Sequence, residues 1–181
     1  GALHLEKHLP VASGIGGGSA DAAAAVRGIV ALTGQEPAGL AARLLALGAD
    51  VPMCHASTPA RVRGIGEEIA PLPLPALPVV LVNPRVEVST PAVFKALTEK
   101  GNPPLGAPPA PADLLPWLAA RRNDLEPPAI ALVPAIGEVL GALRNCGAGL
   151  ARMSGSGATC FGIFTDDSKA GTAARALRAR H

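Results

Sequence analysis

The stretch PVASGIGGGSADAAAAV, residues 10–26, is the most informative part of this amino-acid sequence. Four glycines leave its backbone uncovered, and an alanine-rich run that predicts a helix follows them directly. Bare amides and the roughly half positive charge at a helix N-terminus together favour a bound anion, most naturally a phosphate. Glycine also tolerates positive φ, which lets successive N–H groups converge on one ligand. We therefore predict a phosphate-binding loop here, with a flexible turn and an ordinary helix cap as the alternative.

The ends of the first two helices can be placed from single residues. We expect Ser19 to cap the helix that follows the loop, Asp21 to lie in its first turn and Gly34 to end it. A second helix is expected to open at Pro37 and to close at Gly48. Three leucines at helical spacing should face inward from this second helix: Leu40, Leu44 and Leu47.

The better known nucleotide-binding motifs do not fit the loop. A Walker A motif requires a lysine directly after its last glycine, and none follows Gly18. The dinucleotide fingerprint requires a glycine three residues after Gly16, where Ser19 stands. The protein-kinase set fails as well, because neither His-Arg-Asp nor Asp-Phe-Gly occurs in the chain. A phosphate loop of another class remains, in which Ser19 could add a hydroxyl ligand for the phosphate or for its Mg²⁺.

Composition narrows the class of protein. The chain has 181 residues, of which 49% are hydrophobic and only 2% aromatic, and its net charge is +2. The apolar content argues against disorder, and the lack of aromatic residues and of a basic stripe argues against a nucleic-acid partner. No apolar run approaches the ~20 residues of a membrane span, so no membrane partner is expected. Three scattered cysteines, Cys54, Cys146 and Cys160, form no C-x-x-C pair, which favours a reducing cytoplasm over a disulfide framework or zinc site.

Mixed helices and strands are expected in two units, residues 1–75 and 76–181. Alternating leucines at residues 2–5 indicate a half-buried strand, and the prolines between residues 71 and 78 indicate an extended linker. Further strands are predicted at 79–82, 150–153 and 160–164. Further helices are predicted at 90–97, with Ser89 as its cap, and at 112–121, 134–145 and 167–180.

Four segments, in order along the chain, resemble the motifs of the GHMP kinases, a family that includes galactokinase, homoserine kinase and mevalonate kinase. They are the glycine loop and residues 47–52 (LGADVP), 122–126 (RNDLE) and 153–161 (MSGSGATCF). The resemblance covers essentially the whole chain. It implies an α+β, two-domain GHMP kinase fold. Residues 1–75 would be the remainder of the N-terminal part, which binds ATP and resembles domain 2 of ribosomal protein S5. Residues 76–181 would form a ferredoxin-like C-terminal part.

The resemblance also implies an activity. The extra glycines of the loop resemble those of one branch of the GHMP kinase family. That branch uses ATP to phosphorylate the 2-hydroxyl of 4-diphosphocytidyl-2-C-methyl-D-erythritol, in the non-mevalonate isoprenoid pathway. The expected partner is therefore a small cytidyl diphosphate sugar alcohol, the expected cofactors are ATP and Mg²⁺, and a monomer or weak homodimer is expected. The alternatives are a GHMP kinase of the homoserine or mevalonate type and an inactive nucleotide-binding fragment.

Residue roles carry over from the matching motifs. Asp50 corresponds to the catalytic base that takes the proton of the substrate hydroxyl, with a turn or capping aspartate as the alternative. Thr90 and Phe94 match a substrate-binding segment whose ring stacks on cytosine, although Phe94 could instead share an apolar helix face with Leu97. Ser19 is expected to hold the metal. ATP is expected to contact the loop residues Pro10, Val11, Ala12, Ser13, Gly14, Ile15, Gly16, Gly17, Gly18, Ser19 and Ala20.

Other parts of the family pattern are altered or missing. Ala20 stands where the wider family has a second serine, and the first family motif, Pro-x-Lys-x-Asn-Leu, has no counterpart. The chain is therefore expected to be a fragment that lacks the lysine partner of the catalytic aspartate and has reduced or no activity alone. Lys7 is expected either near the nucleotide or in solvent. Asn123 and Asp124 are expected as structural caps, and the loop at 155–157 is expected to pack beside the phosphate loop.

Overall fold

A computed structural model describes residues 2–8 and 13–179 of the chain. Its contacts form two compact units. The first unit contains Gly16–Leu74 and the described residues before them, except residues 13–15. The second unit contains residues 13–15 and residues 75–179. The chain is therefore mixed helix and sheet, and the glycine loop contributes residues to both units.

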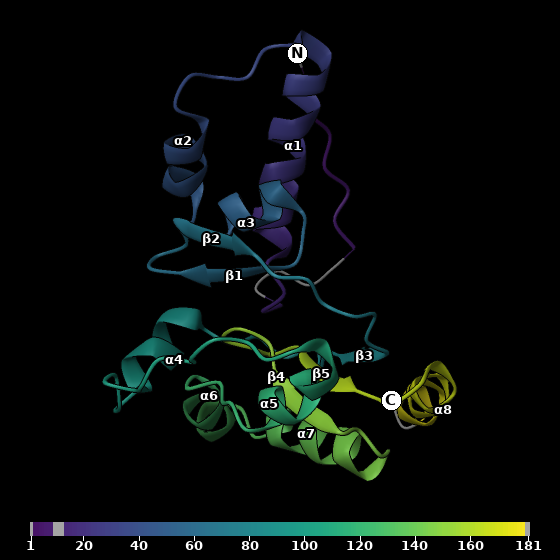
Figure 1. Ribbon diagram of the computed structural model, residues 1–181. Coiled ribbons are helices and arrows are strands. Elements are labelled where there is room, and N and C mark those ends of the chain that lie inside the picture. Colours follow the sequence, from purple (N-terminus) through teal and green to yellow (C-terminus); the bar gives the residue numbers. More distant parts are fainter. Residues whose placement is uncertain (1, 9–12, 180–181) are drawn as a thin grey trace. The chain divides into compact units, whose positions relative to one another are not determined.

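The described part of the first unit consists of three helices and one hairpin (Figure 1). Its helices are α1 (Gly17–Thr33), α2 (Leu40–Leu47) and α3 (Val51–Ala56), and its strands are β1 (Ala60–Arg63) and β2 (Glu68–Pro71). The two strands pair antiparallel, with Ala60 opposite Pro71. A small apolar cluster joins the three helices through Ala23, Leu44 and Val51, which are all buried. The small side chain of Ala23, fully buried in α1, leaves room for the neighbouring helices to come close.

Helix α1 begins earlier than its capping signals predict. Its N-cap is Gly16, at φ 68°, and the helix starts at Gly17. Ser19 therefore lies inside the first turn rather than at the cap, and Asp21 lies beyond that turn, so both sequence predictions are wrong. The C-terminal prediction is confirmed, because Gly34 adopts φ 66° and its N–H donates to the carbonyl of Val30 at 2.9 Å.

Several weaker predictions for the first unit are also wrong. Residues 2–5 form no strand, and Leu3 is 77% exposed, because alternation without a partner strand provides no ladder of hydrogen bonds. Helix α2 starts after Gly39 rather than at Pro37, although Gly48 ends it as expected. Of the leucines predicted inward, Leu44 is buried but Leu47 is 64% exposed, since the helix is only two turns long. Helix α3 and the hairpin were not predicted.

The second unit is built on a three-stranded antiparallel sheet of order β3-β5-β4 (Figure 1). The strands are β3 (Val79–Val82), β4 (Leu150–Met153) and β5 (Cys160–Ile163), all close to their predicted positions. Val80 lies opposite Gly162, and Met153 lies opposite Cys160. Helices α7 (Ala135–Asn145) and α8 (Asp167–Arg178) pack on this sheet and also match their predictions.

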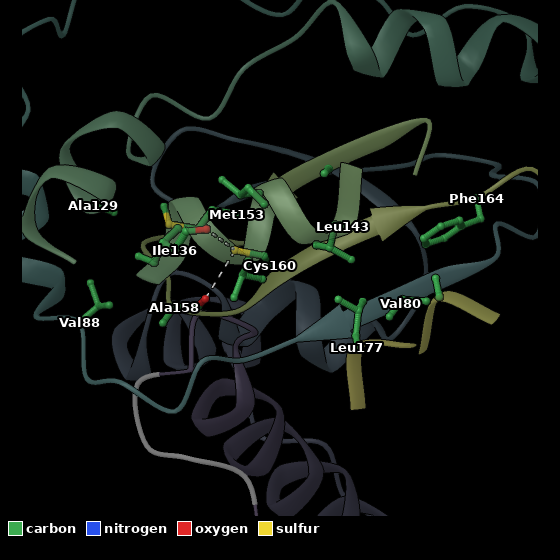
Figure 2. Packing of buried hydrophobic residues seen from close by; sticks show 14 of the residues in the cluster. Val80, Val88, Ala129, Ile136, Leu143, Met153, Ala158, Cys160, Phe164 and Leu177 are labelled. Carbon is green, nitrogen blue, oxygen red and sulfur yellow. Dashed lines mark hydrogen bonds between the residues drawn. The ribbon is translucent and has the colours of Figure 1, made fainter. Parts of the chain in front are cut away.

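The core of the second unit lies between α7 and the sheet. Figure 2 shows Ile136 and Leu143 of α7 together with Met153 of β4 and Cys160 of β5. All four are at most 1% exposed. Burial raises the pKa of the Cys160 thiol to about 12. The Cys160 sulfur lies 4.0 Å from the carbonyl oxygen of Ile136, so this cysteine serves as a core residue.

Shorter helices complete the second unit. They are α4 (Thr90–Ala96), the 3₁₀ turn η1 (Pro111–Asp113), α5 (Leu114–Ala119) and α6 (Glu126–Leu132). The predicted cap of α4 is confirmed, because the Ser89 hydroxyl accepts from the N–H of Ala92 at 3.4 Å. The single helix predicted over 112–121 is instead η1 followed by α5, and α6 was not predicted. Among the described residues no single helix is long and apolar enough to cross a membrane; α6 and α7 reach that standard only as a pair bent by 119°.

Candidate functional site: the glycine loop and its supports

Residues 13–14 of the glycine loop are held by a second loop far along the chain. The N–H of Thr159 donates to the carbonyl of Ser13 at 3.2 Å. The hydroxyl of Ser154 donates to the carbonyl of Gly14 at 2.8 Å. Ser13 and Thr159 are both buried, which shields these polar contacts from water. Residues 154–159 therefore pack against residues 13–14 within the second unit, as the sequence predicts for the loop at 155–157.

Gly14 is required by this packing. It adopts φ +75°, and a Cβ placed on it would lie 2.6 Å from the carbonyl oxygen of Ser154 and closer still to that of Gly157. Both obstacles are backbone atoms, which cannot rotate away as a flexible side chain could. Gly14 thus combines a left-handed backbone with a close approach that excludes any side chain.

The N-terminus of α1 presents backbone donors for which no acceptor lies among residues 2–8 and 13–179. The first hydrogen bond of the helix runs from Ala20 N–H to Gly16 O at 2.9 Å. The N–H groups of Gly17, Gly18 and Ser19 therefore have no acceptor inside the helix. A Cβ placed on Gly18 would meet nothing within 4 Å, so the space beside this turn is open. These donors, together with the positive end of a helix of 17 residues, are suited to an anion.

A cation lies beside the same turn. The Nζ of Lys7 is 2.5 Å from the carboxylate of Asp21 in α1. The same Nζ is 3.7 Å from the position that a Cβ on Gly17 would occupy. Lys7 is thus at the start of α1 rather than free in solvent, and Asp21 acts as its partner instead of complementing the helix dipole.

Asp50 is the N-cap residue of α3, but its side chain makes no capping hydrogen bond. It is exposed between Gly48, which ends α2, and Pro52 in the first turn of α3. Because its carboxylate accepts no backbone N–H as a cap, that carboxylate is available to a ligand. The capping role that the sequence left open is therefore not observed.

Cys54 connects Asp50 to the start of α1. Burial raises the pKa of the Cys54 thiol, the Asp50 carboxylate raises it further, and the Arg27 guanidinium opposes both effects. The Cys54 sulfur is also 3.9 Å from the position of a Cβ on Gly16. Arg27 of α1 donates to the carbonyl of Cys54 at 2.7 Å, which fixes α1 against α3. Asp50 and the N-cap of α1 thus share Cys54 as a neighbour within the first unit.

The hairpin turn supports the segment before Asp50. Gly66 adopts φ +110°, and a Cβ placed on it would overlap the carbonyl oxygen of Ala49. The turn therefore packs directly against the residue that precedes the carboxylate. The sequence contains no signal for this contact, because the hairpin itself was not predicted.

Thr90 and Phe94 lie on α4 in the second unit. The Thr90 hydroxyl is 2.8 Å from the hydroxyl of Ser156, in the loop that supports Gly14. The Phe94 ring is 52% exposed, so the alternative of a core position on an apolar helix face is wrong. One loop, residues 154–159, thus contacts both the start of the glycine loop and the helix that carries the predicted substrate residues.

Asn123 fixes the near end of that loop. Its Nδ2 donates to the carbonyls of Met153 at 3.0 Å and Gly155 at 2.8 Å, while its Oδ1 accepts from Leu125 N–H at 3.0 Å. Glu126 adds a further contact, since its carboxylate accepts from the N–H of Met153 at 2.7 Å. The N-cap of α6 is Leu125, without a side-chain cap, so the prediction of Asn123 as a helix cap is wrong. Asn123 instead makes a local turn contact with Leu125 and a long-range clamp that the sequence does not reveal.

Comparison with known proteins identifies the family. The GHMP kinases N terminal domain profile matches residues 1–58, and the GHMP kinases C terminal profile matches residues 92–181. The chain belongs to the GHMP kinase family.

Similar proteins carry a specific name. This GHMP kinase chain is 59% identical, over 98% of its length, to 4-diphosphocytidyl-2-C-methyl-D-erythritol kinase of Sinorhizobium medicae, and 58% identical, over 98%, to the protein of that name from Paracoccus denitrificans. It spans 60% and 63% of those two proteins. A crystal structure of 4-(cytidine 5'-diphospho)-2C-methyl-D-erythritol kinase matches 96% of the chain, which spans 65% of that structure, with a TM-score of 0.77 and 38% identity. Homoserine kinase from Cytophaga hutchinsonii, at 22% identity and a TM-score of 0.71, shares the fold; the match covers 96% of the chain and 63% of that structure.

Five further residues were predicted to contact ATP in the glycine loop of the GHMP kinase chain: Pro10, Val11, Ala12, Ile15 and Ala20. Pro10, Val11 and Ala12 lie outside the described residues. Ile15 is half-buried and Ala20 is exposed in α1. Among residues 2–8 and 13–179, no group of three histidine, cysteine, aspartate or glutamate side chains could hold a metal ion.

Proposed function

We propose that this chain is the nucleotide- and substrate-binding part of a small-molecule kinase that transfers the γ-phosphoryl group of ATP to the 2-hydroxyl of 4-diphosphocytidyl-2-C-methyl-D-erythritol. The 59% identity over 98% of the chain to a kinase named for this substrate carries the proposal. The cellular setting we propose is the cytoplasm, where the enzyme works in isoprenoid synthesis as a monomer or weak homodimer.

The glycine loop would hold the phosphates of ATP. The free N–H groups of Gly17, Gly18 and Ser19 supply donors, and the N-terminus of α1 supplies positive potential. Gly14, three residues earlier in the loop, is held by residues 154–159 within the second unit. Phosphoryl transfer depends mainly on positioning and charge stabilisation, which a rigid loop of backbone donors provides.

Asp50 would act on the substrate hydroxyl. Its exposed carboxylate accepts the proton of the 2-hydroxyl while that oxygen attacks the γ-phosphorus, and ADP leaves with the electrons of the broken P–O bond. Support comes from the Asp50 carboxylate, which makes no capping hydrogen bond, and from Cys54, the neighbour that Asp50 shares with the start of α1.

Mg²⁺ fits the residues present as a nucleotide-bound ion. Mg²⁺ usually keeps several waters and takes its other ligands from one or two protein oxygens and the phosphates of the substrate. The half-buried Ser19 hydroxyl, in the first turn of α1, is the oxygen ligand that we propose for it. The ion would supply charge neutralisation of the phosphates when ATP is bound.

The cytosine ring of the substrate would stack on Phe94. An aromatic ring that is 52% exposed has a free face for a flat base, and base–aromatic stacking contributes about 1–3 kcal/mol. Thr90 would supply a hydroxyl beside it, oriented by its contact with Ser156.

A coupled ADP-release assay with a panel of small alcohols tests this proposal. We expect reduced turnover with the cytidyl substrate from the chain alone, and a further loss of about 10²–10⁴-fold in Asp50→Asn with ATP binding retained. Asp167→Asn, an exposed carboxylate at the start of α8, is the matched control and should keep full activity. Turnover of homoserine or mevalonate instead would refute the substrate assignment, and ATP binding without turnover of any alcohol would favour the inactive-fragment alternative.

A further inference from the structure

A concave site lies on the second unit, at the outer edge of β4. It is a hollow of about 460 Å³, within the range of about 300–1,000 Å³ that small-molecule sites occupy. Its walls come from β4, from the segment before α6 and from the end of α7. We call it the arginine pocket, after the four arginines that line it: Arg121, Arg122, Arg144 and Arg152.

The charge of the arginine pocket is strongly positive. Glu126 is the acidic side chain among its lining residues, against four guanidinium groups. That carboxylate already accepts the N–H of Met153 at 2.7 Å. Burial lowers the pKa of the Arg152 guanidinium, an effect that the Glu126 carboxylate opposes. Four like charges around one hollow repel one another, and a bound anion would relieve that repulsion.

The arginines divide into supporting and available groups. Arg152 donates to the carbonyls of Leu118 at 3.0 Å and Arg121 at 2.5 Å, so it builds the wall. The Nε of Arg122 donates to Asp124 at 2.6 Å. In contrast, the Nε of Arg121 is buried with no acceptor among the described residues. A buried donor without a partner costs about 1–3 kcal/mol, so the described residues themselves leave the Arg121 guanidinium incompletely hydrogen-bonded.

The edge of β4 adds a backbone donor. Ser154 N–H donates to Thr159 O at 2.8 Å, toward β5. In an antiparallel ladder such bonds alternate, so the N–H groups of Met153 and Ala151 point away from β5. Met153 uses its N–H for Glu126, whereas Ala151 lines the pocket. Guanidinium forks and a backbone N–H are the donors that recognise phosphate oxygens.

We propose that the arginine pocket binds a small phosphate-bearing anion, such as a diphosphate compound, in addition to the ATP that the glycine loop would hold. The concave shape favours a small ligand over a nucleic-acid backbone, which would follow an extended basic stripe with stacking aromatics. The proposal does not depend on the kinase activity, because it concerns residues outside the glycine loop and Asp50.

Trp117 provides a local signal for the test. It is the one tryptophan of the chain, and the Arg121 guanidinium lies 4.7 Å from the centre of its ring. An anion that engages Arg121 should therefore change the Trp117 emission. The experiment titrates the chain with inorganic pyrophosphate and follows this emission. We expect saturable binding, weakened about tenfold to hundredfold in Arg144→Gln.

The matched control is Arg178→Gln, an exposed arginine of α8 whose loss changes the net charge equally. It should leave the affinity unchanged. Absence of a saturable change in emission, or equal weakening by Arg178→Gln, would overturn the proposal. Calorimetry could also detect pyrophosphate binding that does not change the Trp117 emission and is not weakened by Arg144→Gln. That result would overturn the proposal, because the pyrophosphate would then bind elsewhere. If the chain bound a single-stranded oligonucleotide more tightly than pyrophosphate, and Arg144→Gln weakened that binding, the ligand would be a nucleic acid and the proposal of a small anion would be wrong.

Discussion

Substitution of Gly14 by alanine is the sharpest test of how the glycine loop is held. The new Cβ would lie 2.6 Å from the Ser154 carbonyl oxygen and would overlap that of Gly157, so residues 13–14 must move away from residues 154–159. The movement breaks the hydrogen bond from Ser154 to Gly14 at 2.8 Å and the one from Thr159 to Ser13 at 3.2 Å. We expect a less stable second unit and weaker ATP binding.

The magnitude follows from two separable costs. Alanine at φ +75° costs about 1–2 kcal/mol in backbone strain wherever it occurs. The overlap with backbone atoms adds about 1–3 kcal/mol, the usual cost of overpacking. Gly106 separates these costs, because it has the same φ of +75° and a Cβ there would meet nothing within 4 Å. Gly106→Ala should therefore cost only the strain, and Gly14→Ala about 2–5 kcal/mol in total.

Amide hydrogen exchange at Thr159 is the most direct assay. In the unsubstituted chain its N–H is bonded to Ser13, and it should be protected. Gly14→Ala should reduce that protection about fivefold to hundredfold beyond the effect of Gly106→Ala, since about 1.4 kcal/mol corresponds to a factor of ten. Equal protection in the two variants would show that the close approach at Gly14 is not what holds the loop.

Three further predictions concern other parts of the second unit. Asn123→Asp should lower the free energy of unfolding, measured in urea, by about 2 kcal/mol, because it removes the amide donor to the carbonyls of Met153 and Gly155. An unchanged midpoint of urea unfolding would show that these two hydrogen bonds do not stabilise the second unit. Cys160, whose pKa burial raises to about 12, should resist a thiol reagent at pH 8 until the chain unfolds, as mass spectrometry of the labelled protein would show; labelling of the folded protein would contradict its core position. The Asp166 carboxylate accepts the Lys169 N–H, and this hydrogen bond holds the pKa of Asp166 below its usual value. The contribution of Asp166 to stability is therefore present above the unfolded pKa of about 3.9, and it is lost as pH falls through the lower folded pKa. Amide protection in α8 should therefore decrease below about pH 4, and an equal decrease in Asp166→Asn would refute this cause.

Local signals in the sequence were sufficient for much of the fold. Gly34 and Gly48 end α1 and α2 as predicted, and Ser89 caps α4. Each of these signals acts within one turn of helix, so its effect does not depend on distant residues. In the first unit, the elements that depend on strand pairing were predicted poorly. Residues 2–5 alternate like a strand but have no pairing strand among the described residues, and the hairpin of β1 and β2 lacks a strong hydrophobic pattern.

The same division applies to the candidate site. The glycine loop is recognisable from residue type and spacing, and Asp50 and Phe94 are recognisable from the resemblance of their segments to GHMP kinase motifs. The contacts that hold them are not. Asn123 looks like a local cap, yet its amide also spans 30 and 32 residues to hold the loop after β4. No pattern of spacing reveals such a contact, because it depends on how the sheet and helices pack.

The sequence by itself therefore determined the family, the last residues of α1 and α2 and the cap of α4, since these follow from short motifs and one-turn interactions. Only the tertiary structure decided why Gly14 must be glycine. Its obstacle is the backbone near Ser154, 140 residues away, and a contact at that separation exists only once β4 and β5 have paired. The arginine pocket has the same origin, because segments as far apart as Ala119 and Arg152 line it together only in the folded second unit.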